Sequence, residues 1–188
     1  YRSSSPLNAN IKDLFNTNLP KDYKKTDFDK SRFGYKASAV PGTVAGLLEA
    51  HRNFGKLSLK EILKPVIKQA SEGIKVSYDL NKAIESTPQL FNDPESRKIY
   101  FDNGIPLIKN TLMKRPDLAQ TLSYISVNGH KGFYEGPTAE KIIDAMNANN
   151  GFMTLEDFKN YKVNSGPPIS SIYRGNVVFT AGPPSGGG

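Results

Sequence analysis

The sequence predicts an α+β fold that is mostly helical, with a β-hairpin near its C-terminal end. Two observations lead to this class. Apolar residues recur at helical spacing in one segment after another over residues 5–161. Only in "ISSIYRGNVVFT", residues 169–180, does the pattern change to strand, turn and strand. A helical layer that leads into strands beside a Gly-rich stretch is typical of one outer layer of a larger layered protein.

The first predicted helix lies in "SSSPLNANIKDLF", where Ser5 suits the cap and Pro6 suits the first turn. Its apolar face consists of Leu7, Ile11, Leu14 and Phe15. Residues 16–40 are polar and show no periodicity, so we expect a long excursion over the surface.

Two longer helices follow. The helix in "PGTVAGLLEAHRNFG" is expected to end at Gly55, with an inward face of Val44, Leu47, Leu48, His51 and Phe54. The helix in "SLKEILKPVIKQASEG" begins with a capping-box pattern of Ser58 and Glu61, ends at Gly73, and should be kinked by Pro65. Its apolar stripe is Leu59, Ile62, Leu63, Val66, Ile67 and Ala70.

The remaining elements are shorter. A helix carrying Leu80 and Ile84 runs from near Ser77 to Pro88, and an Asn-Gly pair predicts a tight turn or small hairpin near Asn103. Three further helices are predicted in "RPDLAQTLSYISVNG", in "GPTAEKIIDAMNANNG", and in "TLEDFKNY", which Thr154 and Asp157 would cap. In the second of these, the inward residues are Ala139, Ile142, Ile143 and Met146.

Composition limits the class of protein. The 188 residues are enough for one domain with its own core, and we treat residues 1–188 as one domain. No apolar run has the length of a membrane span. The absence of cysteine excludes disulfides, thiolate catalysis and cysteine-ligated zinc. The net charge is +7, but the lysines are spread along the chain, which favours a solvated surface over a nucleic-acid site.

Residues that could carry chemistry inside the chain are few. The two histidines, His51 and His130, lie in no metal-binding pattern; His51 is expected to be packed and hydrogen-bonded, and His130 to lie in a surface turn. No GxSxG or Walker motif is present, and Ser185 in "PPSGGG" has no base assigned to it. We therefore predict no metal, no cofactor and no complete active site.

Five strings in this order resemble one family. They are "AVPGTVAGLLEAHRNFGKL", "LKPVIKQASEGIKV", "LAQTLSYISVNGHKGFYEG", "GFMTLEDFKNYKV" and "YRGNVVFTAGPPSGGG". Together they are similar to the large-subunit region of the γ-glutamyltranspeptidases, over nearly the whole chain and least over residues 12–35. The chain is therefore expected to be a fragment of that large subunit.

The resemblance implies a fold, a chemistry and a partner. The fold would be the mostly helical part of the four-layer α/β/β/α sandwich of an N-terminal nucleophile hydrolase. A self-cleaving precursor would yield a small subunit whose N-terminal Thr, outside these residues, attacks the γ-carbonyl of glutathione or another γ-glutamyl compound. No catalytic residue is then expected in this chain. Family resemblance also suggests a periplasmic or secreted protein, with a cytoplasmic one as the alternative.

The resemblance also suggests substrate-binding positions. Arg2 in "YRSSSPLNA" stands where the family places an arginine against the substrate α-carboxylate, which a guanidinium can grip through two parallel hydrogen bonds. Ser185, Gly186 and Gly187 would form a loop near the nucleophile. The family usually has an acidic residue where Ser3 stands and a serine where Gly186 stands, so the exact substrate stays open.

Two other hypotheses remain beside the enzyme. One is an inactive homologue or scaffold that binds an anionic ligand through its basic surface. The other keeps the fold and changes the substrate, as in acylases that act on cephalosporin side chains or γ-linked polyglutamate.

Overall fold

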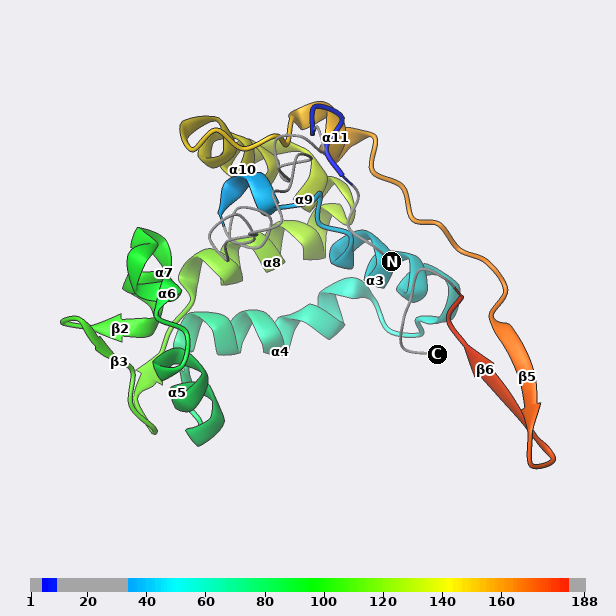
Figure 1. The fold of residues 1–188 in the computed structure, drawn as a ribbon, viewed down its shortest axis with the longest axis horizontal. Coiled ribbons are helices and arrows are strands. Elements are labelled where there is room, and N and C mark those ends of the chain that lie inside the picture. The colour runs from blue at the N-terminus through cyan, green and yellow to red at the C-terminus, as the bar shows by residue number, and fades with distance from the viewer. Residues whose placement is uncertain (1–4, 10–33, 183–188) are drawn as a thin grey trace, which may run out of the picture.

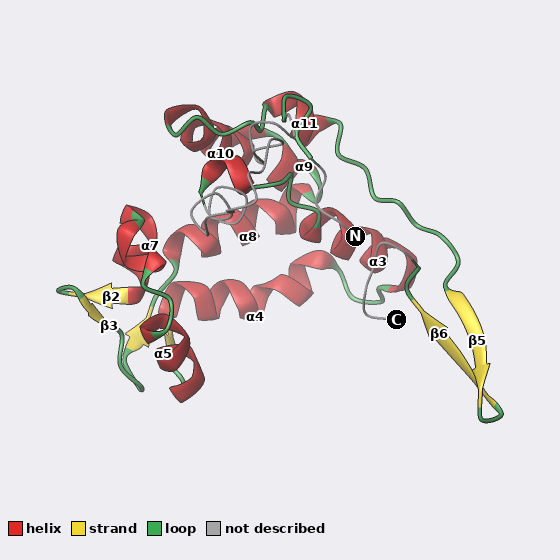
Figure 2. Ribbon diagram, viewed as in Figure 1, coloured by secondary structure: helices red, strands yellow, loops and turns green. Residues whose placement is uncertain are grey.

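The structure is a computed structural model, and it describes residues 5–9 and 34–182. It confirms the α+β class: most described residues are helical, and the strands form three two-stranded antiparallel sheets (Figure 1). Figure 2 shows that the helices gather in one body while the last hairpin extends away from it.

The helices of the described residues come in three groups, and short strands follow each group. The helices are η1 (Tyr35–Ala37, 3₁₀), α3 (Thr43–Phe54), α4 (Leu59–Glu72), α5 (Tyr78–Glu85), α6 (Gln89–Asn92), α7 (Pro94–Tyr100), α8 (Pro116–Asn128), α9 (Lys131–Tyr134), α10 (Gly136–Ala148) and α11 (Leu155–Lys159). The strand pairs are β1 (Ile74–Lys75) with β4 (Leu112–Met113), β2 (Phe101–Asp102) with β3 (Ile105–Pro106), and β5 (Ile169–Tyr173) with β6 (Asn176–Thr180).

The predicted helix ends are confirmed where side chains cap them. The Ser58 hydroxyl accepts from the Glu61 N–H, and the Glu61 carboxylate accepts from the Ser58 N–H, which completes the capping box of α4. Ser77 caps α5 in the same position. Pro65 lies inside α4, and the helix continues past it to Glu72.

The predicted inward faces of α3 and α4 are only partly right. In α3 the buried residues are Ala45 and Gly46, while Leu47 and Phe54 are exposed. Ala45 is buried beside Tyr134, whose hydroxyl accepts from the Ala45 N–H. α4 has no buried residue, since in the described structure it is covered chiefly by α8, which runs beside it (Figure 1).

The largest core lies between α9, α10 and α11, with α3 and η1 at its side (Figure 1). Of the residues predicted to face inward on α10, Ala139, Ile143 and Met146 are buried, and Ile142 packs against the same cluster. The other buried members are Val40, Ala45, Tyr134, Met153, Phe158 and Tyr161. We call this set the helical cluster.

Two predictions near the N-terminus need correction. Residues 5–9 contain a turn, closed by the Ala9 N–H on the Pro6 carbonyl at 3.0 Å, where a helix was predicted. The rest of that predicted helix lies outside the described residues. The surface excursion predicted for residues 16–40 does not extend to its end, because Val40 is 0% exposed within the helical cluster. Val40 lies three residues before the first residue of α3 and is buried in the same cluster as Ala45 of that helix.

The predicted hairpin at residues 169–180 is confirmed as β5–β6, in the register Ile169 to Thr180 and Tyr173 to Asn176. Arg174 and Gly175 form its turn with positive φ angles of 49° and 80°, which is the turn type that matches the twist of a two-residue hairpin. Every residue of β5 is exposed, as are all of β6 except Thr180.

Candidate substrate-binding frame

The four residues predicted for the substrate site, Arg2, Ser185, Gly186 and Gly187, lie outside the described residues. The structure does describe the chain that follows Arg2, from Ser5, and the chain that precedes Ser185, up to Gly182. What can be built from the described residues is therefore the frame that holds these two segments.

The segment after Arg2 is fixed to α11 through its backbone. The Leu7 N–H donates to Asp157 Oδ1 at 2.7 Å, across 150 residues of sequence. Pro6 is buried beside it, whereas the Leu7 side chain is 70% exposed. The position of this segment therefore depends on a main-chain hydrogen bond and on Pro6, and not on packing of the Leu7 side chain.

Asp157 is buried and uses both carboxylate oxygens. Oδ2 accepts from the Thr154 N–H at 2.8 Å and from the Thr154 hydroxyl at 2.7 Å, which confirms the predicted cap of α11. Oδ1 accepts from Leu7. The sequence identified Asp157 as a helix cap, but it held no signal for the second bond, because capping patterns are local and Leu7 is distant in sequence.

Two of the family-like strings meet at Tyr134. Its hydroxyl donates to the Pro41 carbonyl at 2.6 Å and accepts from the Ala45 N–H at 3.2 Å. This contact joins α9, in "GFYEG", to the first turn of α3, in "PGTVAGL". Burial of the phenol raises the pKa of Tyr134, because the charged phenolate would lose its hydration.

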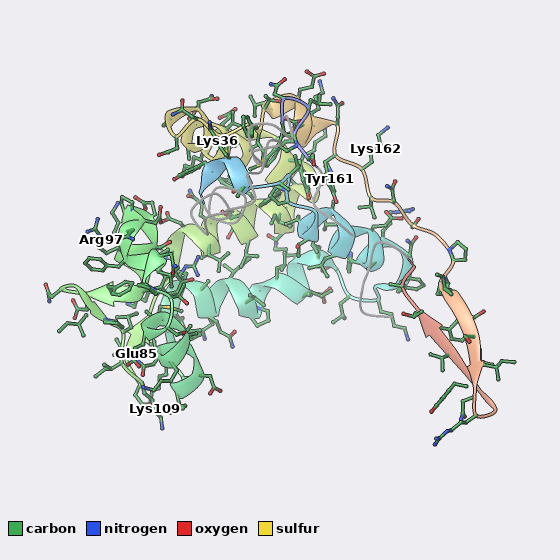
Figure 3. All side chains as sticks on the ribbon, in the orientation of Figure 1. Lys36, Glu85, Arg97, Lys109, Tyr161 and Lys162 are labelled. Atoms are coloured by element: carbon green, nitrogen blue, oxygen red, sulfur yellow. The ribbon has the colours of Figure 1, made fainter. Side chains whose placement is uncertain are left out.

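Gly132 allows α9 to lie against the end of α8. A Cβ at this position would collide with the backbone carbonyl of Tyr124. The side chain of Tyr134 then stacks on Tyr161, with ring centroids 5.5 Å apart and planes 2° from parallel. Tyr161 and Lys162 lie where the chain leaves the helical cluster toward the hairpin (Figure 3).

The chain approaching Ser185 leaves β6 beside a shallow hollow at the base of the hairpin. The lining includes Asn164, Pro167, Phe179 and Gly182. Gly182 lies against the Ile169 side chain. This hollow carries no ionisable side chain, so its described residues offer shape but no charge to a ligand.

Both histidines make packing contacts. The His51 ring nitrogen Nε2 lies 2.8 Å from the Leu57 carbonyl oxygen, and the His130 ring stacks on Tyr134 at 4.3 Å. Burial lowers the pKa of His130.

Over residues 5–9 and 34–182, no group of three or more His, Cys, Asp or Glu residues could hold a metal ion. In the same ranges, no helix is both long and apolar enough to span a bilayer.

Comparison with known proteins identifies the family of the chain. A sequence model described as gamma-glutamyltranspeptidase matches residues 1–188. The chain is 35% identical over 190 residues to a glutathione hydrolase proenzyme of Escherichia coli, with 100% of this chain and 32% of the relative covered. It is 38% identical over 149 residues to the capsule biosynthesis protein CapD proenzyme of Bacillus anthracis, covering 79% of this chain and 27% of the relative.

A comparison with solved structures identifies the fold. The structure superposes on a crystal structure of the gamma-glutamyltranspeptidase of Helicobacter pylori with a TM-score of 0.89 and 30% identity, covering 98% of this chain and 52% of that one. The fold is thus the mostly helical part of an N-terminal nucleophile hydrolase. The chain belongs to the γ-glutamyltranspeptidase family. It spans about a third of the length of the E. coli relative.

Proposed function

We propose that this chain is the large-subunit part of an enzyme that cleaves γ-glutamyl amide bonds in glutathione and related compounds. The observation that carries the proposal is the family match over residues 1–188, with ordered motifs that also meet in space. Relatives named glutathione hydrolase support this choice of substrate class.

The reaction would proceed in two steps. A threonine hydroxyl of the small subunit attacks the γ-carbonyl carbon, and its proton passes to the threonine amine. The amide C–N bond then breaks, and the leaving amine takes a proton. Water or an amino acid amine attacks the resulting γ-glutamyl ester and restores the threonine. In this scheme the present chain binds and orients the donor, and it supplies no nucleophile.

Arg2 is proposed to bind the α-carboxylate of the donor. Asp157 and Pro6 support this role, because they fix the chain shortly after Arg2 to the helical cluster. Ser185, Gly186 and Gly187 are proposed to lie near the nucleophile; they follow β6, which runs back from the tip of the hairpin toward the helices (Figure 1).

The proposed partner is the small subunit of the same precursor. The relatives are named proenzymes. In addition, the hairpin exposes Ile172, Tyr173, Val177 and Phe179 in the described structure, which is a surface that a second polypeptide segment would cover. We propose no nucleic-acid partner and no cofactor.

Kinetics on the complete protein test the proposal. Release of p-nitroaniline from γ-glutamyl-p-nitroanilide is expected from the complete protein, together with two chains by mass spectrometry, one beginning with threonine. Residues 1–188 alone should release none. A single uncleaved chain without activity would instead favour the inactive scaffold, and activity only on other acyl donors would favour a related acylase.

Arg2 is tested with matched donors. Arg2→Ala should lower kcat/KM about ten- to a hundredfold, because a charged hydrogen-bond partner is lost. Arg2→Lys keeps the positive charge but lacks the planar guanidinium, so its kcat/KM should fall less than that of Arg2→Ala. A donor whose α-carboxylate is amidated should be affected little by either change. Equal losses on the two donors would mean that Arg2 acts through folding or maturation.

A further inference from the structure

We propose that Asp157 is a positioning residue for substrate binding: its Oδ1 holds the chain segment that carries Arg2 in register with the helical cluster. This inference rests on the proposed role of Arg2. It goes beyond that role by naming the side chain that would determine where Arg2 can reach.

The first argument is geometric. Leu7, whose N–H donates to Asp157 Oδ1 at 2.7 Å, follows Arg2 by five positions. Five residues span at most about 17 Å when fully extended. The bond therefore anchors a short tether, and the buried Pro6 restricts the backbone inside that tether.

The second argument concerns the anchor itself. α11 is a firm support, because Phe158, the residue after Asp157, is 0% exposed in the helical cluster. The carboxylate is oriented by two bonds from Thr154 to Oδ2, which leaves Oδ1 facing Leu7. A hydrogen bond to an ionised acceptor is stronger than one between neutral groups.

The third argument is that the two oxygens have separable tasks. Oδ2 completes the cap of α11, and Oδ1 alone reaches the N-terminal segment. An amide at position 157 has one acceptor oxygen and one NH₂ group. Its oxygen can therefore accept either from Leu7 or from Thr154, but not from both sides as the carboxylate does. Replacing Thr154 by Ala removes the hydroxyl bond to Oδ2 but keeps the bond from the backbone N–H, so the carboxylate is expected to stay oriented toward Leu7.

Two variants of the complete enzyme remove the contact from opposite sides. Asp157→Asn weakens the acceptor. Leu7→Pro removes the donor; Leu7 is the second residue of the turn closed by Ala9 and Pro6, a position that proline favours. Each variant has a matched control. Thr154→Ala disturbs the same helix cap, and Leu7→Ala keeps the N–H while removing the exposed side chain.

The measurement is kcat and KM on a γ-glutamyl donor with a free α-carboxylate and on its α-amide. Asp157→Asn and Leu7→Pro are each expected to lower kcat/KM for the free acid about tenfold, mainly through KM, and to change the amide little. The two controls, Thr154→Ala and Leu7→Ala, should leave kcat/KM unchanged for both donors. In an Arg2→Ala background, Asp157→Asn should cause no further loss, because the residues act as one unit.

The outcomes separate the two proposals. If Arg2→Ala impairs the free acid but Asp157→Asn and Leu7→Pro behave like their controls, the positioning role is wrong and the Arg2 assignment stands. Equal losses on both donors would also overturn the positioning role, since that result indicates a fold defect. If Arg2→Ala itself has no effect, both proposals fall.

Discussion

The helical cluster and the β5–β6 hairpin use similar residues in opposite ways. In the cluster, Tyr134 is 1% and Phe158 0% exposed. In the hairpin, Ile172 is 75% and Phe179 68% exposed. Successive residues of a strand point to opposite faces, and Ile172 and Tyr173 are both exposed, so both faces of the hairpin are open. An isolated two-stranded hairpin is marginally stable at best.

The difference shows which apolar side chains are buried by other described residues of this chain and which are not. The cluster buries its aromatic residues against neighbours from α3, α9, α10 and α11. Within the described residues no segment covers the hairpin, which fits the second polypeptide proposed above. The half-exposed stripe of α4, with Ile62 and Val66 in contact with solvent, fits the same interpretation.

The largest expected effect tests this contrast with two identical substitutions. In the chain of residues 1–188, Phe158→Ala should lower the free energy of unfolding by about 3–5 kcal/mol, because it leaves a cavity in a packed core. Phe179→Ala should change it by less than about 0.5 kcal/mol, because the ring contacts mainly water. Urea titrations of both variants give the two values.

The same pair sharpens the contrast in the complete protein. There the loss for Phe179→Ala should approach that of a buried phenylalanine if the hairpin is covered. A Phe179→Ala variant as stable as the parent in both forms would show that the hairpin stays open to solvent.

A smaller effect is expected at Tyr134. Tyr134→Phe keeps the ring stacked on Tyr161 but removes the hydroxyl that bridges Pro41 and Ala45. Leaving buried polar groups without a partner costs about 1–3 kcal/mol, so the urea midpoint should fall with an unchanged m-value. An unchanged midpoint would mean that water replaces the hydroxyl.

The pKa of Tyr134 gives an independent check by pH. Because burial raises this pKa in the folded state, the stability linked to the neutral phenol is present below the unfolded value of about 10. It is lost as pH rises through the folded pKa. Between about pH 9 and 11, a window around the unfolded pKa, the parent should therefore lose more stability than Tyr134→Phe. Equal losses of stability in the two proteins would contradict a buried phenol.

Much of the fold could be predicted from local patterns. Capping pairs such as Ser58 with Glu61 and Thr154 with Asp157 act within one turn, so the sequence shows them directly. The β5–β6 hairpin and its turn could be predicted for the same reason. The helices α6, α7 and α9 were missed, since they have four to seven residues and are too short for a period to be visible.

Burial and the candidate site could be predicted less well. Apolar stripes indicate which face of a helix can be buried, but not whether a neighbour is present, and therefore Leu47 and Phe54 were wrongly assigned to the interior. The bond from Leu7 to Asp157 joins segments 150 residues apart, and no local pattern encodes it. Arg2 and Ser185 came from family resemblance, and their roles stay predictions.

The smallest global effect is expected from one methyl group at the hairpin turn. Gly175 has a φ of 80°, and a Cβ there would meet no neighbouring atom, so Gly175→Ala adds only backbone strain of about 1–2 kcal/mol. In residues 1–188 this strain should open β5–β6 locally, since little else holds the two strands. Hydrogen exchange of the β5 and β6 amides should accelerate while the urea midpoint stays unchanged.

Gly132→Ala provides the contrast in the helical cluster, because its Cβ collides with the Tyr124 backbone and should lower the urea midpoint itself. If Gly175→Ala also lowered the midpoint of residues 1–188, the hairpin would be part of the cooperative core, and the distinction between a complete cluster and an uncovered hairpin would fail.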